Sequence, residues 1–286
     1  MKLCTIIVLF HPNVEDLVLS LPTFNNETDG VILWKNSIIN DDCKKVISSY
    51  NNLMVAGNEN NLGIATALNR SIQLAKQNGF SHVLTMDQDS YFDEGLILQY
   101  RSKINSFSYD DIGVFGINPI QLDTYLFKKE HRALEVSDTI TSGSIFKISN
   151  FERTGYFEDD LFIDAVDYEY CYRAKSQFGL RTIVFSDILM HHRVGHSEKT
   201  KLGFSKNNYS AFRMYFIIRN HLTIWKRYPE IFPHRYRVTL IKDHILFRAV
   251  KIILFEKNKL KKIKSIIMGI YHFIIGKLGF YNISSK

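Results

Sequence analysis

Two carboxylates separated by a single residue stand directly after an apolar segment of the chain. Asp87 and Asp89 follow the segment 82–86, whose apolar side chains are typical of a buried strand. Carboxylates at positions i and i+2 can share one hard divalent cation, which keeps its other positions for water and substrate phosphates. Solvated acidic turns are common, but the place of this pair at the end of a strand favours a metal site.

A second group of ionisable residues lies in the segment 162–173, around an expected helix. If Asp167 begins that helix, the helix dipole favours its negative charge, and a carboxylate there can accept the proton of a substrate hydroxyl. Glu169 and Arg173 are spaced i,i+4, so they can form an ion pair. An N-cap beside a surface ion pair would need no catalytic role, and spacing alone favours this plainer alternative.

Three further segments contain residue types that bind anions or metals. A histidine cluster at 191–196 can supply a third metal ligand, although a single histidine is more often structural. The segment 141–144 either lets backbone amides approach a substrate or forms an ordinary turn. Gly63 opens a helix after a loop, and a helix N-terminus attracts phosphate. This segment has neither the Gly-Lys-Ser/Thr of nucleotide hydrolases nor the three glycines of dinucleotide binders.

These residues need a scaffold, and the chain alternates strand-like with helix-like segments. We predict strands at 3–10, 31–34, 53–56, 82–86 and 112–117, and helices at 14–21, 41–50, 63–78, 94–107 and 167–177. Continuous apolar strands separated by helices indicate an α/β fold with a mainly parallel sheet covered on both faces. In such sheets ligands bind beyond the carboxyl ends of the strands, where the candidate residues fall.

The charge of the chain is unevenly distributed. Residues 226–286 contain 14 Lys and Arg against three acidic residues, whereas residues 1–225 contain 22 against 26. The tail is also rich in Ile, Leu and Phe, and a basic, apolar surface suits an anionic membrane better than nucleic acid. Its longest uncharged stretch, 265–276, has twelve residues, fewer than the roughly 20 that span a bilayer. We therefore expect residues 226–286 to be an amphipathic helical region that lies on a membrane, or a helical cap on a catalytic domain at 1–225.

Cysteine use bears on the compartment. Cys4, Cys43 and Cys171 are too few and too scattered for a disulfide framework or a metal cluster. A reducing, cytoplasmic location is therefore expected.

Taken in order, these segments resemble the family-2 glycosyltransferases, and bacterial rhamnosyltransferases in particular. The likeness covers residues 3–225 and depends on the ordered set of motifs, not on any one of them. Its matching pieces are Thr5–Pro12, Asn61–Asn69, Asp87–Ser90, Thr141–Ser144, Phe162–Arg173, His192–Gly195, Tyr215 and Arg219-Asn220. The resemblance implies a nucleotide-diphospho-sugar transferase (GT-A-like) fold with a central, mostly parallel mixed sheet, plus the basic helical C-terminal region.

The resemblance also assigns roles to individual residues. Asp87 and Asp89, with His192 nearby, would hold a Mg²⁺ or Mn²⁺ ion on the donor diphosphate. Asp167 would be the catalytic base. The residues that complete its motif are Glu169 and Arg173, and the donor-binding set is Phe10, His11, Pro12, Asn36, Asn61, Gly63, Ala67, Asn69, Asp87, Gln88, Asp89, Ser142 and Gly143. Lys35 departs from the family, which usually has an acidic residue there to contact the base or ribose.

The implied activity is an inverting transfer of a sugar from a nucleotide-diphosphate donor to the hydroxyl of a glycan or lipid-linked acceptor. The resemblance suggests dTDP-rhamnose as donor, bacterial surface-polysaccharide synthesis as the setting, and the inner face of the cell membrane as the location. A haloacid-dehalogenase-like phosphotransferase would need its nucleophile loop near the N-terminus. A nucleotidyltransferase would need a glycine-rich, basic turn at 10–13. A non-enzymatic membrane-binding protein would have no reason to place carboxylates after strands.

Overall fold

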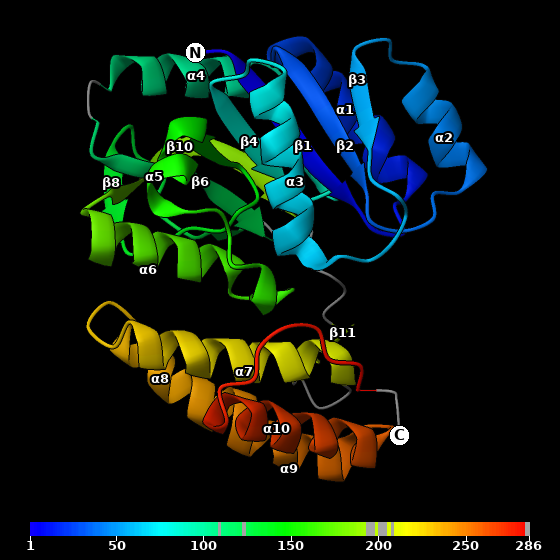
Figure 1. Ribbon diagram of the computed structural model, residues 1–286, viewed down its shortest axis with the longest axis vertical. Coiled ribbons are helices and arrows are strands. Elements are labelled where there is room, and N and C mark those ends of the chain that lie inside the picture. Colours follow the sequence, from blue (N-terminus) through cyan, green and yellow to red (C-terminus); the bar gives the residue numbers. More distant parts are fainter. Residues whose placement is uncertain (108–109, 122–123, 193–197, 200–204, 207–208, 284–286) are drawn as a thin grey trace.

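The computed structural model describes residues 1–107, 110–121, 124–192, 198–199, 205–206 and 209–283. An α/β domain lies beside a layer of C-terminal helices (Figure 1). The strands are β1 (Leu3–Leu9), β2 (Gly30–Lys35), β3 (Leu53–Ala56), β4 (His82–Met86), β5 (Ser90–Tyr91), β6 (Ile112–Gln121), β7 (Thr124–Tyr125), β8 (Ala133–Val136), β9 (Ser144–Lys147), β10 (Arg181–His192), β11 (Glu198–Lys199) and β12 (Ser205–Lys206). The helices are α1 (Val14–Glu27), α2 (Asp41–Ser48), α3 (Gly63–Gln77), α4 (Leu96–Ser106), α5 (Ile148–Thr154), the 3₁₀ turn η1 (Asp159–Leu161), α6 (Val166–Phe178), α7 (Ala211–Arg227), α8 (His234–Thr239), the π-helix η2 (Leu240–Leu246), α9 (Phe247–Phe255) and α10 (Lys259–Ile274).

Ten of the described strands form one mixed sheet. Its order is β3-β2-β1-β4-β9-β6-β10-β5, with β7 on β6 and β8 on β10. Strands β1 to β4 run parallel to one another, as do β6 and β10. Because β9 runs antiparallel between β4 and β6, the carboxyl ends of β4 and β10 reach the same edge of the sheet. The predicted mostly parallel mixed sheet is therefore confirmed.

Both faces of the sheet are covered by helices, as continuous apolar strands require. Along β1, Cys4, Ile6 and Val8 face a core that also contains α3, α5 and α6. Leu3 and Ile7 face the opposite core, which α1, α2 and α4 complete. This separation follows from the two-residue period of a strand, which sends alternate side chains to opposite faces.

The predicted elements agree closely with the observed ones in the first half of the chain. Strands β3 and β4 have the predicted bounds, whereas α1 continues past Pro22 to Glu27. The extension has a structural reason, because the carboxylate of Glu27 accepts hydrogen bonds from the backbone amides of Gly95 (2.6 Å) and Ile97 (3.1 Å) at the start of α4. Strand β6 is four residues longer than predicted because Pro119 falls within it without ending its pairing with β10.

The C-terminal helices pack against one another below the α/β domain (Figure 1). Gly269 lets α10 approach α7 closely, since a Cβ there would lie 3.1 Å from the carbonyl oxygen of Tyr215. The same two helices are joined by a 2.6 Å hydrogen bond between the Tyr215 hydroxyl and Nδ1 of His272. Among the described helices, none combines the length and the apolar character that crossing a bilayer requires.

Candidate active site

The ends of β4 and β10 bring together three residues that can ligate a metal. One ligand atom each from Asp87, Asp89 and His192 lies within 4.8 Å of the others. Nδ1 of His192 is 2.8 Å from the hydroxyl of Ser90 and 4.0 Å from Oδ2 of Asp87. Burial raises the pKa of Asp87; His192 and Arg213 oppose that shift, and the charge of Asp89 adds to it. Two carboxylates that repel each other beside an imidazole fit a divalent cation.

The segment 141–144 packs against the loop that carries Asp87 and is hydrogen-bonded to it. The hydroxyl of Ser142 accepts a 3.0 Å hydrogen bond from the backbone amide of Asp87. Gly143 has a φ of +79°, and a Cβ there would lie 2.5 Å from Ile117 and 2.8 Å from the sulfur of Met190. Ser142 is 1% exposed. Both residues pack beneath the loop that carries Asp87, and their contact with the donor stays a prediction.

The turn after β1 borders the metal-binding loop. Gln88 forms two hydrogen bonds with Phe10, accepting from its amide (2.8 Å) and donating to its carbonyl (3.1 Å). The amide of His11, whose φ is +49°, donates to the hydroxyl of Ser37 (2.7 Å). The carbonyl of Pro12 accepts a hydrogen bond from the Cys43 thiol. These bonds fix the turn next to the carboxylates, where a donor would pass.

A small polar network places the start of α3 on the same side. The amide oxygen of buried Asn36 accepts from the backbone of Leu62 (2.9 Å), and its nitrogen donates to Asn61 (3.3 Å). Gly63 has a φ of +78°, and a Cβ there would lie 2.6 Å from Phe162. Asn36 therefore supports the loop with its side chain instead of offering that side chain to a ligand.

Two residues predicted to line the nucleotide are buried in the structure. Ala67 is fully buried in the core. Asn69 is 6% exposed and uses its amide on the segment after α5, donating to the carbonyl of Phe157 (2.8 Å) and to Oδ1 of Asp159 (2.8 Å). Their roles at the nucleotide stay predictions, although Ala67 packs in the core and the Asn69 amide is bonded within the protein.

The helix predicted from Asp167 begins one residue earlier, at Val166, so Asp167 is its second residue and Ala165, not Asp167, is the N-cap. Its Oδ1 accepts a 3.0 Å hydrogen bond from the amide of Tyr168. Burial raises the pKa of Asp167 to about 7, and the charges of Asp138 and Asp164 add to that shift. A carboxyl group that titrates near neutrality can hold and release a proton under physiological conditions.

Glu169 and Arg173 form a pair that is buried instead of lying on the surface. The guanidinium of Arg173 donates to both carboxylate oxygens of Glu169, at 2.9 and 3.0 Å, and to the carbonyl of Tyr156 at 2.7 Å. The hydroxyl of Tyr228 donates to the same carboxylate at 2.9 Å. The pair therefore joins α6, which carries Asp167, to the preceding segment and to the end of α7.

Sequence patterns missed a second ion pair at the site. Arg213, in the first turn of α7, lies 3.2 Å from Oδ1 of Asp164, whose side chain is 12% exposed. The positive charge of Arg213 also acts on Asp87, and the negative charge of Asp164 acts on Asp167. Asp164 and Arg213 thus link the carboxylates at the end of β4 with the candidate base. The only sequence signal was that Asp164 lies within the Phe162–Arg173 motif.

The loop before α6 has an unusual backbone conformation. Phe162, Asp164 and Ala165 have φ values of +65°, +62° and +65°, which non-glycine residues rarely adopt. Asn220 of α7 holds this loop by donating to the carbonyls of Leu161 (2.9 Å), Ile163 (2.8 Å) and Asp164 (2.9 Å). Strain concentrated beside a titratable carboxylate is typical of functional sites.

The histidine cluster lies only partly within the described residues. His191 is 3.2 Å from Asp93 and stacks on Tyr91, so it has a structural role. The motif residues Arg193, Val194 and Gly195 and the histidine at 196 lie outside the described residues. His192 is thus the member of this cluster that the structure places at the carboxylate pair.

The fold is that of the GT-A glycosyltransferases. The chain is 24% identical over 290 residues to the dTDP-rhamnosyl transferase RfbF of Shigella flexneri, with 96% of each protein covered. The structure of S. aureus TarS 1–349 with UDP-GlcNAc is similar at a TM-score of 0.61 and 15% identity, over 96% of this chain and 81% of that one. The Pyrobaculum calidifontis mannosyltransferase PcManGT, with GDP-Man and Mn²⁺, gives a TM-score of 0.56 at 11% identity over 96% and 88%. No protein-family model matches the chain.

These comparisons confirm the predicted GT-A-like fold and the predicted resemblance to bacterial rhamnosyltransferases. They also support the predicted class of enzyme, a nucleotide-sugar glycosyltransferase, over a phosphotransferase or a non-enzymatic protein.

Proposed function

We propose that this chain transfers L-rhamnose from dTDP-rhamnose to a hydroxyl group of a glycan or lipid-linked acceptor, with inversion at the anomeric carbon. The observation on which this depends is a carboxyl group with a pKa of about 7, Asp167, linked through Asp164 and Arg213 to the carboxylates at the end of β4. The choice of donor is supported by the alignment with a dTDP-rhamnosyl transferase along nearly the whole chain.

On the donor side, Asp87, Asp89 and His192 would hold Mg²⁺ or Mn²⁺, which when bound neutralises negative charge on a departing nucleotide diphosphate. The turn at Phe10–Pro12 and the Asn61–Gly63 loop border the space for the nucleotide. Lys35, which replaces an acidic residue, lies 3.6 Å from Glu59. Glu59, in the loop after β3, therefore places a carboxylate beside the position that Lys35 occupies.

On the acceptor side, Asp167 removes the proton as the acceptor oxygen attacks the anomeric carbon. The new bond joins that oxygen to the carbon, the bond from the carbon to the diphosphate oxygen breaks, and the proton stays on the Asp167 carboxyl. Glu169 and Arg173 keep α6 in place, and Asn220 keeps the loop before it in its strained conformation.

The donor assignment is tested by thermal stabilisation with a panel of nucleotide sugars, each measured with Mn²⁺ and with EDTA. We expect dTDP-rhamnose to raise Tm most, and only when the metal is present. The variant Asp93→Asn should give the same stabilisation as the unmodified chain, because Asp93 pairs with His191 and is not one of the three candidate metal ligands. Equal stabilisation by UDP- and GDP-sugars would reject dTDP-rhamnose as the specific donor.

The C-terminal region supports a location on a membrane, where a lipid-linked acceptor would be concentrated. Large apolar side chains are exposed across α9 and α10, among them Phe247, Leu254, Phe255, Leu260 and Ile274. They are mixed with lysines, and a surface of this kind binds anionic bilayers. We propose that the enzyme is peripheral on the cytoplasmic face of the membrane.

Vesicle sedimentation tests this location. Phe255→Glu with Leu260→Glu should reduce binding to phosphatidylglycerol vesicles at least about tenfold, because two apolar contacts are lost and two negative charges are added. Leu98→Glu, an exposed leucine on α4, is the matched control. Deleting the tail is a poor test, because Gly279 accepts a hydrogen bond from Arg219 and donates one to Asp160 beside the active-site loop. Unchanged binding by the double variant would reject the membrane surface.

A further inference from the structure

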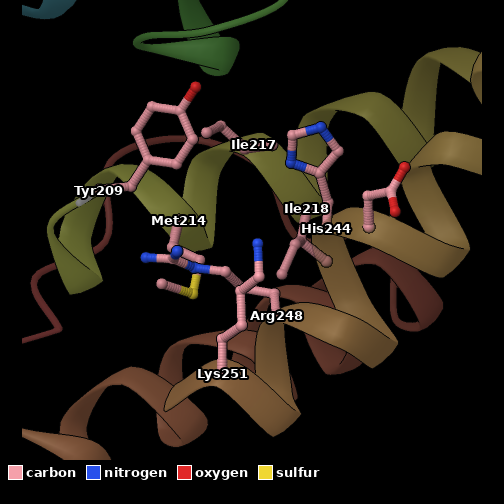
Figure 2. A pocket seen from close by; sticks show the side chains of 8 residues that line it. Tyr209, Met214, Ile217, Ile218, His244, Arg248 and Lys251 are labelled. Carbon is pink, nitrogen blue, oxygen red and sulfur yellow. The ribbon is translucent and has the colours of Figure 1, made fainter. Parts of the chain in front are cut away.

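A pocket of about 240 Å³ lies between α7 and the segment formed by η2 and α9 (Figure 2). One wall is apolar and consists of Met214, Ile217 and Ile218 from α7. The other wall is polar, and Arg248 and Lys251 of α9 supply its positive charges. The pocket borders a π-helix, a conformation that is rare and frequent at functional sites.

The polar wall contains an arginine that is unusually well buried. Arg248 is 8% exposed, and its Nε has no hydrogen-bond partner among the described residues. Glu256 binds its terminal nitrogens and also binds Lys262, so these three residues together keep one positive charge. Lys251 is exposed and has no carboxylate at ion-pair distance within the described part of the chain. Asp243 is the acidic residue on the wall, and it leaves the pocket positive overall.

Two residues that line the pocket contact neighbours of the candidate base. The ring of Tyr209, at the edge of the pocket, lies 5.6 Å from the guanidinium of Arg213, which pairs with Asp164. Tyr236 lies on the other side: burial raises its pKa, and the charges of Asp164 and Asp167 add to that shift. The ring of Tyr236 is 6.3 Å from that of His244, which lines the pocket. Tyr209 and His244 of the pocket are therefore connected, through Arg213 and Tyr236, with the residues around Asp167.

We propose that this pocket binds the phosphate of an amphiphilic acceptor, a phosphate ester with an alkyl or polyprenyl chain. The phosphate would lie against Arg248 and Lys251, and the first carbons of the chain against Met214 and Ile217. Val250, an exposed apolar residue, lies beside Lys251 on α9, one of the two helices proposed to lie on the membrane. The inference rests on the proposed transferase function and adds to it where the acceptor is held.

The test uses the full chain and farnesyl phosphate below its aggregation concentration, with calorimetry as the measurement. Lys251→Glu should weaken the Kd about five- to twentyfold, because an attractive charge becomes a repulsive one at a partly exposed site. Asp243→Asn should tighten the Kd about two- to fivefold, because a repulsive charge is removed. Lys257→Glu, an exposed lysine outside the pocket, is the matched control and should change Kd less than about twofold. A purely structural role for these residues would not produce opposite shifts.

Two further ligands separate the sources of binding. Inorganic phosphate and farnesol should each bind at least about tenfold more weakly than farnesyl phosphate, since each lacks one of the two contacts. Equal affinity for inorganic phosphate would show a free-phosphate site, and equal losses in Lys251→Glu and Lys257→Glu would show general charge attraction. Either outcome overturns the proposal. The affinity for dTDP with Mn²⁺, measured separately, should be the same in all variants. If the unmodified chain does not bind dTDP, the transferase assignment is rejected, whereas the binding of farnesyl phosphate still decides whether the pocket is a phosphate-ester site.

Discussion

The pH dependence of transfer gives the sharpest test of Asp167. A general base acts as the carboxylate, so the rate follows the fraction ionised. With a pKa of about 7, that fraction falls about tenfold for each pH unit below neutrality and reaches about 1% at pH 5. An aspartate at its ordinary value of 3.8 would still be more than about 90% ionised there. The kcat/KM for the acceptor, with donor and Mn²⁺ saturating, should therefore fall about a hundredfold between pH 8 and pH 5.

Two variants assign this titration to its group. Asp167→Asn should lower kcat about 10²–10⁴-fold, remove the acid limb and leave the affinity for dTDP unchanged. Asp138→Asn should move the limb to lower pH, because the negative charge of Asp138 contributes to the raised pKa of Asp167. Asp160→Asn, an exposed carboxylate on the same segment, should do neither.

Stability separates loss of the base from loss of the fold. The folded-state pKa of Asp167 is raised, so its ionisation opposes folding, and that cost grows as pH rises from about 4 to about 7. Asp167→Asn should therefore have an equal or higher Tm at pH 8. A variant with near-normal turnover, or one that keeps the acid limb near pH 7, would refute the assignment of the base.

Three other substitutions test the parts around the base. Asp89→Ala should abolish the part of dTDP binding that depends on the metal. Calorimetry in which Mn²⁺ raises the dTDP affinity of this variant as much as that of the unmodified chain would reject the metal role. Asn220→Ala should lower the free energy of unfolding by about 2–4 kcal/mol, because three carbonyls of the strained loop lose their donor. Its kcat should fall more than its affinity for dTDP, and an equal fall in both would contradict a role at the loop. Gly143→Ala should cost at least about 1 kcal/mol, since φ is +79° and the new Cβ would overlap Ile117; a denaturation midpoint that does not move would contradict this packing.

Much of the scaffold could be predicted because the strands of this chain are buried on both faces. A strand such as β4 is a continuous apolar run whose bounds are visible in the sequence. The rule that ligands bind at the carboxyl ends of strands then located Asp87, Asp89 and His192. These residues meet because β4 and β10 end at the same edge, although 102 positions separate Ser90 from His192.

The rest depends on how segments distant in the sequence pack together. Whether the Asn69 amide faces a ligand or the protein is decided by the segment 157–159, which no periodicity in α3 reveals. The Asp164–Arg213 pair exists only because α7 docks beside the loop before α6. The spacing of Glu169 and Arg173 predicted their ion pair but not that it would be buried and bonded to the carbonyl of Tyr156.

The C-terminal helices connect the proposed membrane surface with the proposed base. Arg219 of α7 is fully buried and donates to the carbonyls of Asp160 and Gly279, so one side chain joins the active-site loop to the end of the chain. The boundary at 225/226 stays a prediction, but residues on both sides of it contact the loop that leads to Asp167. Because α7 lies between α6, which carries Asp167, and the basic, apolar helices α9 and α10 (Figure 1), an acceptor anchored at those helices would be confined to the part of the molecule that holds the base. Such a restriction raises the effective concentration of the acceptor hydroxyl without any contact to its sugar.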